Sequence, residues 1–266
     1  MSNYNNLLQN SLFFNKNLIK EKNEIKLNIA CGPNIFPFDG WINYDRANLD
    51  EYFNHIKKIA NEMNATPPEN YSAGLLSALK PMPQHQLNFV NFLKNGGQIN
   101  YNIQDLKSGF SQHPDNSVSV IYLGQMIEHL NPIYEVKNML RECYRMLVPG
   151  GVIRITTPDL DLLIKAYINN EMDKFASEQP DFYKNADSSA QLAYLMYGAC
   201  GPNCSWDNYE GHMFLYTQKS MSKLLEDCGF KNITYYYETG KSLSKTLERE
   251  VYDAGMSHSF IVECVK

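Results

Sequence analysis

The chain has 266 residues and a formal net charge of −5 at pH 7, and its length suits one large domain with insertions better than two independent domains. This acidic balance, without any run of Lys and Arg, argues against a nucleic-acid partner, which needs a positively charged surface. No apolar stretch approaches the roughly 18–20 residues that span a bilayer, and residues 1–23 lack the apolar core of a signal peptide, so we expect a cytoplasmic protein without membrane insertion.

The first predicted elements are two short strands joined by a tight connection. Residues 25–30 form an apolar stretch, and residues 41–44 form a second one that ends at Asp45. The connection over 31–40 contains two prolines and leaves room for one helical turn rather than a full crossover helix. Strand, small-residue turn and terminal carboxylate are typical of a nucleoside site in a doubly wound fold. The small residues let the cofactor approach the backbone, and the carboxylate accepts hydrogen bonds from the ribose hydroxyls.

The rest of the chain alternates helices with strands. Helical spacing or composition predicts helices over 50–65, 86–94, 132–147 and 218–227, with Thr217 as N-cap of the last. Further strands are expected at 98–103, 117–123, 152–157, 233–238 and 259–265. Pro149-Gly150-Gly151 is expected to end the third helix and to turn the chain into the strand after it. This order predicts an α/β fold, doubly wound around a mostly parallel seven-stranded sheet.

Two blocks interrupt this alternation, and we interpret both as helical or irregular insertions. Residues 46–97 precede the third strand, and residues 158–216 follow the fifth, where a long irregular block is expected to form a substrate lid. With an N-terminal extension over 1–24, they belong to a single domain spanning 1–266.

The six cysteines predict neither a disulfide framework nor a metal site. Cys143 and Cys228 fall on apolar stripes of predicted helices, and Cys264 lies in the terminal strand, where a thiol behaves as a small hydrophobic group. Cys200 and Cys204 are the only close pair. A disulfide or half a metal site is open to them, but no second pair or nearby His cluster completes four ligands, so we expect no bound metal.

Five segments, in the right order, resemble class I S-adenosylmethionine-dependent methyltransferases, and specifically the bacterial branch that reads LNLGCG and then GWINVD. They are residues 27–32 with 40–45, 115–130, 147–151, 211–213 with 224–230, and 259–263. Ala30 stands where a second glycine is usual, which leaves Gly32 as the residue of this turn with an unrestricted backbone.

The resemblance implies S-adenosyl-L-methionine as cofactor and gives roles to the turn and to the second strand. Ala30, Cys31 and Gly32 would line the methionine end and the ribose. Asp45 would hold the ribose hydroxyls, because ligands of such sheets bind at the carboxyl ends of the strands. The alternative for Asp45 is a solvated carboxylate at a strand end.

The same resemblance places four later residues at the cofactor. Asp105 would accept a hydrogen bond from the adenine amino group, with Leu106 as an apolar wall, although a turn-forming Asp is the alternative. Gln125 and Met126 begin the loop after the fourth strand and would lie beside the sulfonium.

Two histidines are the candidates for catalysis. Methyl transfer is an in-line displacement that needs alignment and exclusion of water, and an oxygen nucleophile also needs a base. His129 and His212 supply the side chain best suited to this near neutral pH. Glu128 is the weaker candidate, since a carboxylate there can serve the helix dipole. His129 is as well explained as a structural histidine. The aromatics around His212 form a substrate wall, lie near the sulfonium cation or make up a small core: Tyr197, Trp206, Tyr209 and Tyr216.

These features predict methyl transfer from S-adenosylmethionine to a polar small molecule. The second insertion is acidic and aromatic, which suits such an acceptor better than a polyanion. Analogy with the family adds O-methylation of a sugar or a sugar-linked phosphoryl group. A catalytically inactive binding or scaffold protein of the same fold is the alternative. A nicotinamide-dependent dehydrogenase is disfavoured, because the chain lacks the G-x-G-x-x-G turn before a full helix. N-methylation and the oligomeric state stay open.

Overall fold

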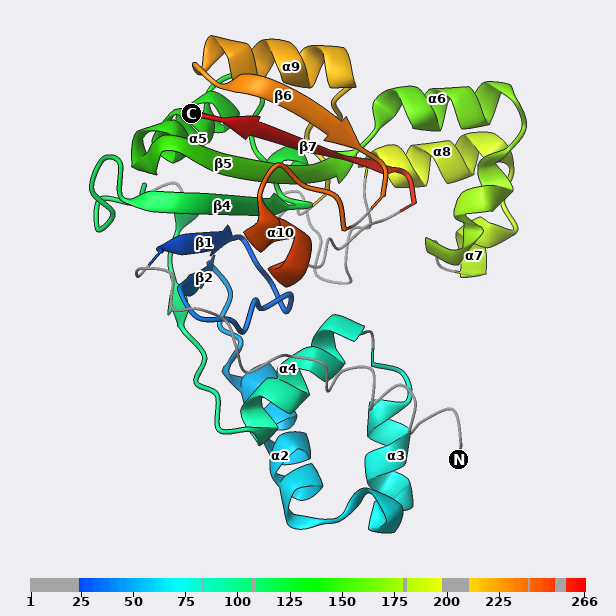
Figure 1. Ribbon diagram of the computed structural model, residues 1–266. Coiled ribbons are helices and arrows are strands. Elements are labelled where there is room, and N and C mark those ends of the chain that lie inside the picture. Colours follow the sequence, from blue (N-terminus) through cyan, green and yellow to red (C-terminus); the bar gives the residue numbers. More distant parts are fainter. Residues whose placement is uncertain are drawn as a thin grey trace.

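A seven-stranded sheet forms the centre of the computed structural model, which describes residues 24–82, 84–106, 109–178, 181–197, 211–238, 240–251 and 257–266 (Figure 1). The strand order across the sheet is β3-β2-β1-β4-β5-β7-β6. The strands are β1 (Lys26–Ile29), β2 (Trp41–Asp45), β3 (Tyr101–Ile103), β4 (Val118–Gly124), β5 (Leu147–Pro158), β6 (Lys231–Tyr236) and β7 (Ser259–Val265). The predicted fold class, a mostly parallel doubly wound sheet, is confirmed.

The register of the sheet brings the carboxyl ends of its parallel strands together. β3, β2, β1, β4 and β5 pair in parallel, and β7 runs antiparallel to both β5 and β6. Ile29, at the end of β1, lies opposite Tyr44 on one side and Leu123 on the other. The turn after β1, the end of β2 and the segment after β4 therefore meet at one edge, where ligands of such sheets bind.

The main core lies between the sheet and two helices, α5 (Glu135–Met146) and α9 (Gln218–Asp227). α5 buries a stripe of apolar side chains at helical spacing: Val136, Met139, Leu140, Cys143 and Met146. α9 has the predicted bounds and the predicted cap, because the Thr217 side chain accepts a hydrogen bond from the Ser220 N–H. On the other face, the short helix α10 (Lys245–Glu250), which the sequence did not predict, packs Leu247 against Trp41 and its neighbours.

The first insertion is a helical unit with a core of its own, and it lies beside β1 and β2 (Figure 1). It contains α2 (Asp50–Ala65), the short 3₁₀ turn η1 (Pro68–Asn70), α3 (Ala73–Leu79) and α4 (Gln84–Lys94). α2 has the predicted bounds, whereas α3 forms in the proline-rich stretch without having been predicted. Ser72 caps α3 by accepting the Leu75 N–H, and Leu75 and Leu79 anchor it in the unit's core.

The second insertion is helical over its described part, so the long irregular block expected there is wrong. It contains α6 (Leu160–Ile168), the 3₁₀ segment η4 (Met172–Glu178), α7 (Asp181–Lys184) and α8 (Ser188–Tyr197). These elements are short and share a small separate core, which is why no long amphipathic period marks them in the sequence. They lie beyond the carboxyl ends of the parallel strands (Figure 1).

The structure differs from the prediction for the turn at Pro149-Gly150-Gly151. β5 begins at Leu147, so Pro149-Gly150-Gly151 lies within the extended segment instead of turning the chain between helix and strand. The irregularity is absorbed in the pairing of β4 with β5, where the register shifts between Val118 and Val120. Cys200 and Cys204 lie outside the described residues. None of the helices that the structure describes is both long and apolar enough to cross a membrane.

Candidate active site

The turn after β1 takes an unusual backbone path at two residues. Gly32 has φ +48°, and a Cβ added there would meet no atom within 4 Å, so the turn faces open space. Ala30 also has a positive φ, 56°. The expectation that Gly32 alone adopts such a conformation is therefore wrong. Ala30 holds a left-handed conformation that costs an alanine about 1–2 kcal/mol, and the surrounding structure must maintain it.

Asp45 at the end of β2 is fixed to this turn by hydrogen bonds. Its Oδ2 accepts from the Gly32 N–H at 2.7 Å, and its Oδ1 accepts from the Ala47 N–H at 2.9 Å. The carboxylate is buried, so it is not a solvated strand end. Each carboxylate oxygen has two lone pairs, so each oxygen can accept a second hydrogen bond.

Two buried asparagines that sequence reasoning missed hold the connection between β1 and β2. Asn28 Nδ2 donates to the Asn34 carbonyl at 2.8 Å and to Asn43 Oδ1 at 2.9 Å. Asn43 Oδ1 also accepts from the Phe36 N–H at 3.0 Å. The sequence carries one signal for them, because an amide in the middle of an otherwise apolar strand must find partners when it is buried.

A cavity of about 360 Å³ opens beside the turn. Its lining joins β1, the turn, the end of β4 and the first insertion: Asn28, Cys31, Pro33, Asn34, Gln86, Tyr122 and Gly124. The cavity, the open space at Gly32 and the remaining acceptor capacity of Asp45 fit a nucleoside cofactor such as S-adenosylmethionine. Burial raises the pKa of the Cys31 thiol, which keeps this wall of the cavity uncharged.

The other residues that the resemblance assigned to the cofactor follow β3 and β4. Asp105 is exposed, and Leu106 packs at the rim of the main core. Met126 is buried in the main core. Gln125 has φ +50°, and its side-chain amide donates to Ser259 Oγ at 3.0 Å, so its side chain is engaged by β7.

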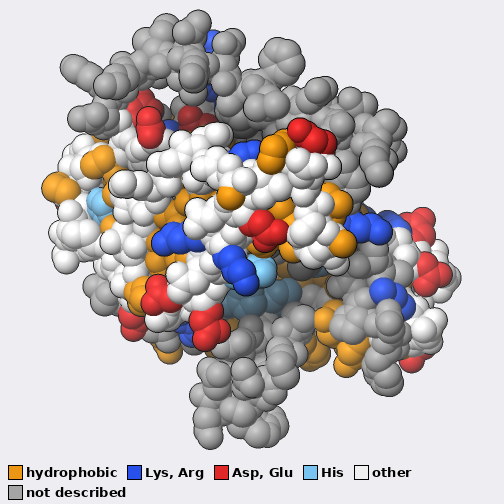
Figure 2. Space-filling view, turned by 90° about the horizontal axis from the view of Figure 1, so that it is seen from below, with side chains coloured by type: hydrophobic (Ala, Val, Ile, Leu, Met, Phe, Trp, Pro, Cys, Tyr) orange, Lys and Arg blue, Asp and Glu red, His pale blue; other side chains and the backbone are white. Residues whose placement is uncertain are grey.

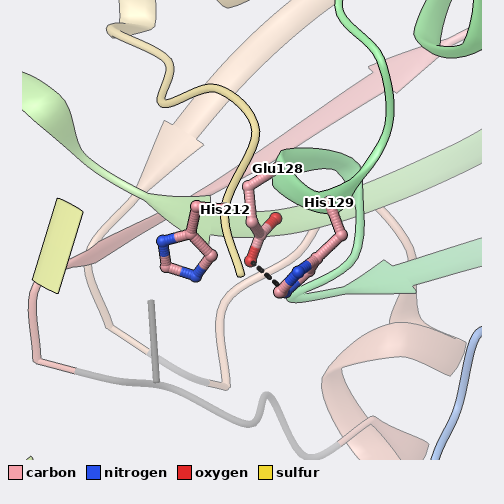
Figure 3. Close-up of side chains that lie close together, drawn as sticks. All are labelled: Glu128, His129 and His212. Carbon is pink, nitrogen blue, oxygen red and sulfur yellow. Dashed lines mark ion pairs between the residues drawn. The ribbon is translucent and has the colours of Figure 1, made fainter. Parts of the chain in front are cut away.

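A second group of polar side chains lies at the same edge, after β4, in the 3₁₀ turn η3 (Ile127–His129) (Figure 3). Glu128 is 0% exposed. Its Oε2 accepts from Thr157 Oγ1 at 3.0 Å, whereas its Oε1 has no hydrogen-bond partner among the described residues and lies 4.0 Å from His129 Nε2. The end of the second insertion docks here, because the N–H groups of Met213 and Phe214 both donate to the Glu128 carbonyl.

This docking brings His129 and His212 together, with their ring centroids 5.0 Å apart. His129 Nδ1 donates to the Gly211 carbonyl, and His212 Nδ1 donates to the Met196 carbonyl, each at 3.2 Å. Because a carbonyl can only accept, both rings carry hydrogen on Nδ1, and a neutral ring then has its lone pair on Nε2.

Burial sets the charges of this cluster. Desolvation raises the pKa of Glu128 to about 7. Desolvation, with the neighbouring His129 as the second cause, lowers the pKa of His212 to about 4, so His212 is neutral at pH 7. His129, with 38% of its side chain exposed, is the more accessible of the two rings. Of the aromatics expected around His212, Tyr216 is buried, and its burial together with the neighbouring Glu128 carboxylate raises its pKa. Tyr197 is exposed, and Trp206 and Tyr209 lie outside the described residues.

Comparison with known proteins identifies the family. The family described as "Methyltransferase domain" matches residues 27–235. Similar solved structures include a SAM-dependent methyltransferase from Archaeoglobus fulgidus (13% identity, TM-score 0.44, covering 91% of this chain and 86% of that one). A second is a SAM-dependent methyltransferase, possible histamine N-methyltransferase, from Thermotoga maritima (12% identity, TM-score 0.43, covering 99% of this chain and 89% of that one). A third is described as SAM-dependent methyltransferases from Methanosarcina mazei (15% identity, TM-score 0.44, covering 92% of this chain and 94% of that one). No curated protein matches the sequence.

The matched region contains all five parallel strands, the turn after β1 and Asp45, together with the cluster of Glu128, His129 and His212. It covers most of the chain. The chain therefore belongs to the methyltransferase-domain family, and it is a class I S-adenosylmethionine-dependent methyltransferase.

Proposed function

We propose that this enzyme methylates a hydroxyl group of a polar small molecule, with a sugar or a sugar-linked phosphoryl group as the acceptor class. The observation that carries the proposal is the pair of histidines after β4, whose hydrogen bonds leave the ring lone pairs on Nε2. A neutral amine can attack a methyl group with its own lone pair. A hydroxyl has a high pKa and must lose its proton to a base as it reacts, so a built proton acceptor favours an oxygen acceptor.

The cofactor is proposed to lie along the carboxyl edge of β1 and β2. Ala30, Cys31 and Gly32 border the open space of the turn, and Asp45 has the acceptor capacity that two ribose hydroxyls need. The adenine end is assigned to Asp105 and Leu106, and the sulfonium end to the backbone around Gln125 and Met126. When bound, S-adenosylmethionine supplies a methyl group activated by a positively charged sulfur.

On the acceptor side, His129 is proposed to receive the hydroxyl proton at Nε2. It is partly exposed, whereas His212 is the weaker base because burial lowers its pKa to about 4. Glu128 Oε1, 4.0 Å from His129 Nε2, favours the protonated ring by charge attraction. In this arrangement His129 accepts the proton and Glu128 stabilises the protonated ring.

The polar small acceptor is supported by the surface as well as by the family resemblance. On the face shown in Figure 2, basic and acidic side chains of the described residues are interspersed, which does not favour a polyanionic partner. The sugar class rests on the resemblance alone.

The test is methyl transfer to a panel of acceptors. We would incubate the enzyme with S-adenosylmethionine and with monosaccharides, sugar phosphates, nucleotide sugars and matched amino sugars, and identify the methylated atom by mass fragmentation. The expected product is a methyl ether or a methyl phosphoester. His129→Asn keeps a donor near the position of Nδ1 but removes Nε2, and it should lower kcat by roughly 10²–10⁴-fold.

The matched control is His55→Gln, on the exposed side of α2, which should leave transfer unchanged. N-methylated products alone, or equal rates for His129→Asn and the wild type, would contradict the proposed chemistry.

A further inference from the structure

We infer that Glu128, His129 and His212 form a site for a divalent transition-metal ion, with an open coordination position for the acceptor hydroxyl. Binding of the ion stands on the geometry of these three side chains. Only its catalytic consequence rests on the proposed function.

The three side chains offer one ligand atom each, and these atoms all lie within 4.8 Å of one another. Figure 3 shows the Glu128 carboxylate between the two imidazole rings. Ligands about 2.0 Å from a tetrahedral ion lie roughly 3.3 Å apart, so small rotations of the rings would close the site. His129, whose side chain is partly exposed, gives the ion a path from solvent.

The hydrogen bonds around the cluster have the arrangement that metal ligands need. Histidines that bind metal typically donate their other ring N–H to a carbonyl or a carboxylate, which fixes the ring and its tautomer. His129 and His212 both do so through Nδ1, to the carbonyls of Gly211 and Met196. Thr157 Oγ1 holds Oε2 of Glu128, which leaves Oε1 as the oxygen toward the rings.

The buried carboxylate is the second, independent observation. Among the residues that the structure describes, Glu128 is fully buried, its Oε1 has no hydrogen-bond partner, and no Lys or Arg forms an ion pair with it. Burying a carboxylate without compensation is costly, and buried charges are normally paired or bound to metals. A cation between Oε1 and the two rings supplies the missing partner.

The ligand types select the class of ion. Two imidazole nitrogens and one carboxylate suit zinc and other first-row transition metals, whereas calcium and magnesium prefer oxygen ligands. Three protein ligands leave a fourth position on zinc, as in catalytic sites. The expectation of no metal came from the spacing of the cysteines, and a site that joins 128–129 to residue 212 has no such local signature.

The ion would replace His129 as the group that activates the acceptor hydroxyl, because the Nε2 lone pair of His129 is then used to bind the ion. A hydroxyl bound to a metal ion loses its proton far more readily than a free one. The proton goes to solvent, a bond forms between the acceptor oxygen and the methyl carbon, and the bond between that carbon and sulfur breaks. No electrons are exchanged with the metal, so a redox-inert ion such as zinc suffices.

The test of binding is calorimetric titration of chelator-treated protein with Zn²⁺. Cys200→Ser and Cys204→Ser are introduced as background, because thiols outside the cluster also bind zinc. We expect one site of micromolar or tighter affinity. Glu128→Gln and His212→Asn should each weaken it by roughly 100-fold or more, and Thr157→Val by about 10–100-fold, the usual cost of an outer partner. Glu226→Gln and His55→Gln, at exposed positions, should not change it.

Two outcomes would overturn the inference. One is that the protein does not bind Zn²⁺. The other is that Glu128→Gln, His129→Asn and His212→Asn bind Zn²⁺ as tightly as the wild type does, while circular dichroism shows all three variants to be folded. A Co²⁺-substituted protein gives a second reading, because its visible absorption reports nitrogen and oxygen ligands and should change in the same variants.

Activity measurements separate this inference from the proposed function. Loss of methyl transfer on chelation, with recovery on adding Zn²⁺ or Mn²⁺, supports the role of the ion at the hydroxyl, and unchanged transfer after chelation overturns that role. Zinc binding that needs all three side chains, without transfer to any hydroxyl acceptor, supports the metal site and contradicts the proposed function alone.

Discussion

Among the described residues, two glutamates are fully buried at or beside the sheet, and they are compensated in opposite ways. Glu263 in β7 is 0% exposed, as Glu128 is. Glu263 forms a 2.6 Å ion pair with the buried Arg154 of β5 and also accepts hydrogen bonds from Ser242 Oγ and the Leu243 N–H. Every oxygen of this carboxylate is engaged inside the fold.

Glu128 has no such set of partners. One of its oxygens accepts from the Thr157 hydroxyl, and the other has no hydrogen-bond partner among the described residues and lies 4.0 Å from the His129 imidazole. This difference in partners distinguishes Glu263, a charge with a structural role, from Glu128, a charge available for function. A carboxylate that the fold satisfies holds strands together, whereas one that the fold leaves unsatisfied at a ligand-binding edge is available to a ligand or an ion.

The largest effect is expected from breaking the satisfied pair. Arg154→Ala leaves Glu263 buried without its cation, which should lower the free energy of unfolding by about 3–5 kcal/mol. Urea denaturation followed by circular dichroism measures the loss. A stability equal to that of the wild type would show that the pair is not a structural charge in this sense.

The second prediction concerns metal addition. Zn²⁺ at 100 times its dissociation constant should raise the free energy of unfolding of the wild type by about 2.7 kcal/mol, because only the folded chain holds the site together. Glu128→Gln should show none of this gain, and without Zn²⁺ its stability should lie within about 1 kcal/mol of the wild type, in contrast to Arg154→Ala. Thermal or urea unfolding with and without Zn²⁺ makes the comparison. An equal gain in both proteins would place the ion elsewhere.

Asp45 provides a third case, a buried carboxylate compensated by backbone N–H groups. Asp45→Ala should weaken binding of S-adenosylmethionine roughly tenfold or more, since charge-assisted hydrogen bonds contribute about 1.5–3 kcal/mol. Calorimetry measures the affinity, with Asp39→Ala in the preceding connection as control. Unchanged affinity in a folded Asp45→Ala protein would remove the ribose assignment.

The smallest effect is expected at a buried histidine beside a like charge. Burial and, secondarily, Arg145 lower the pKa of His113, whose Nε2 lies 2.9 Å from Tyr44 Oη. The neutral folded ring therefore contributes stability that is complete above the unfolded pKa of about 6.5 and is lost as pH falls through the lower folded pKa. His113→Gln should flatten the fall in stability that begins as pH drops below about 6.5. A steeper fall in the variant would reverse the sign.

Prediction from sequence succeeded where the signal is local. α2 and α9 have the expected bounds because a cap or a change of composition marks their ends, and β1 and β2 follow from short apolar runs. It failed for the second insertion, whose helices are too short to show a long amphipathic repeat and are stabilised by contacts with one another. It also failed at Ala30, because alanine rarely adopts a positive φ and nothing in the local sequence signals one.

The sequence by itself determined the order of the seven strands, the class of cofactor and the carboxylate at the end of β2. These depend on neighbouring residues and on motifs that recur in a fixed order. Only the tertiary structure decided that Glu128 is buried with an unsatisfied oxygen and that His212 joins it. Docking of the Met213 and Phe214 N–H groups on the Glu128 carbonyl brings the end of the second insertion to η3. A contact between residues so far apart in the chain depends on how the insertion packs, and no spacing in the sequence encodes it.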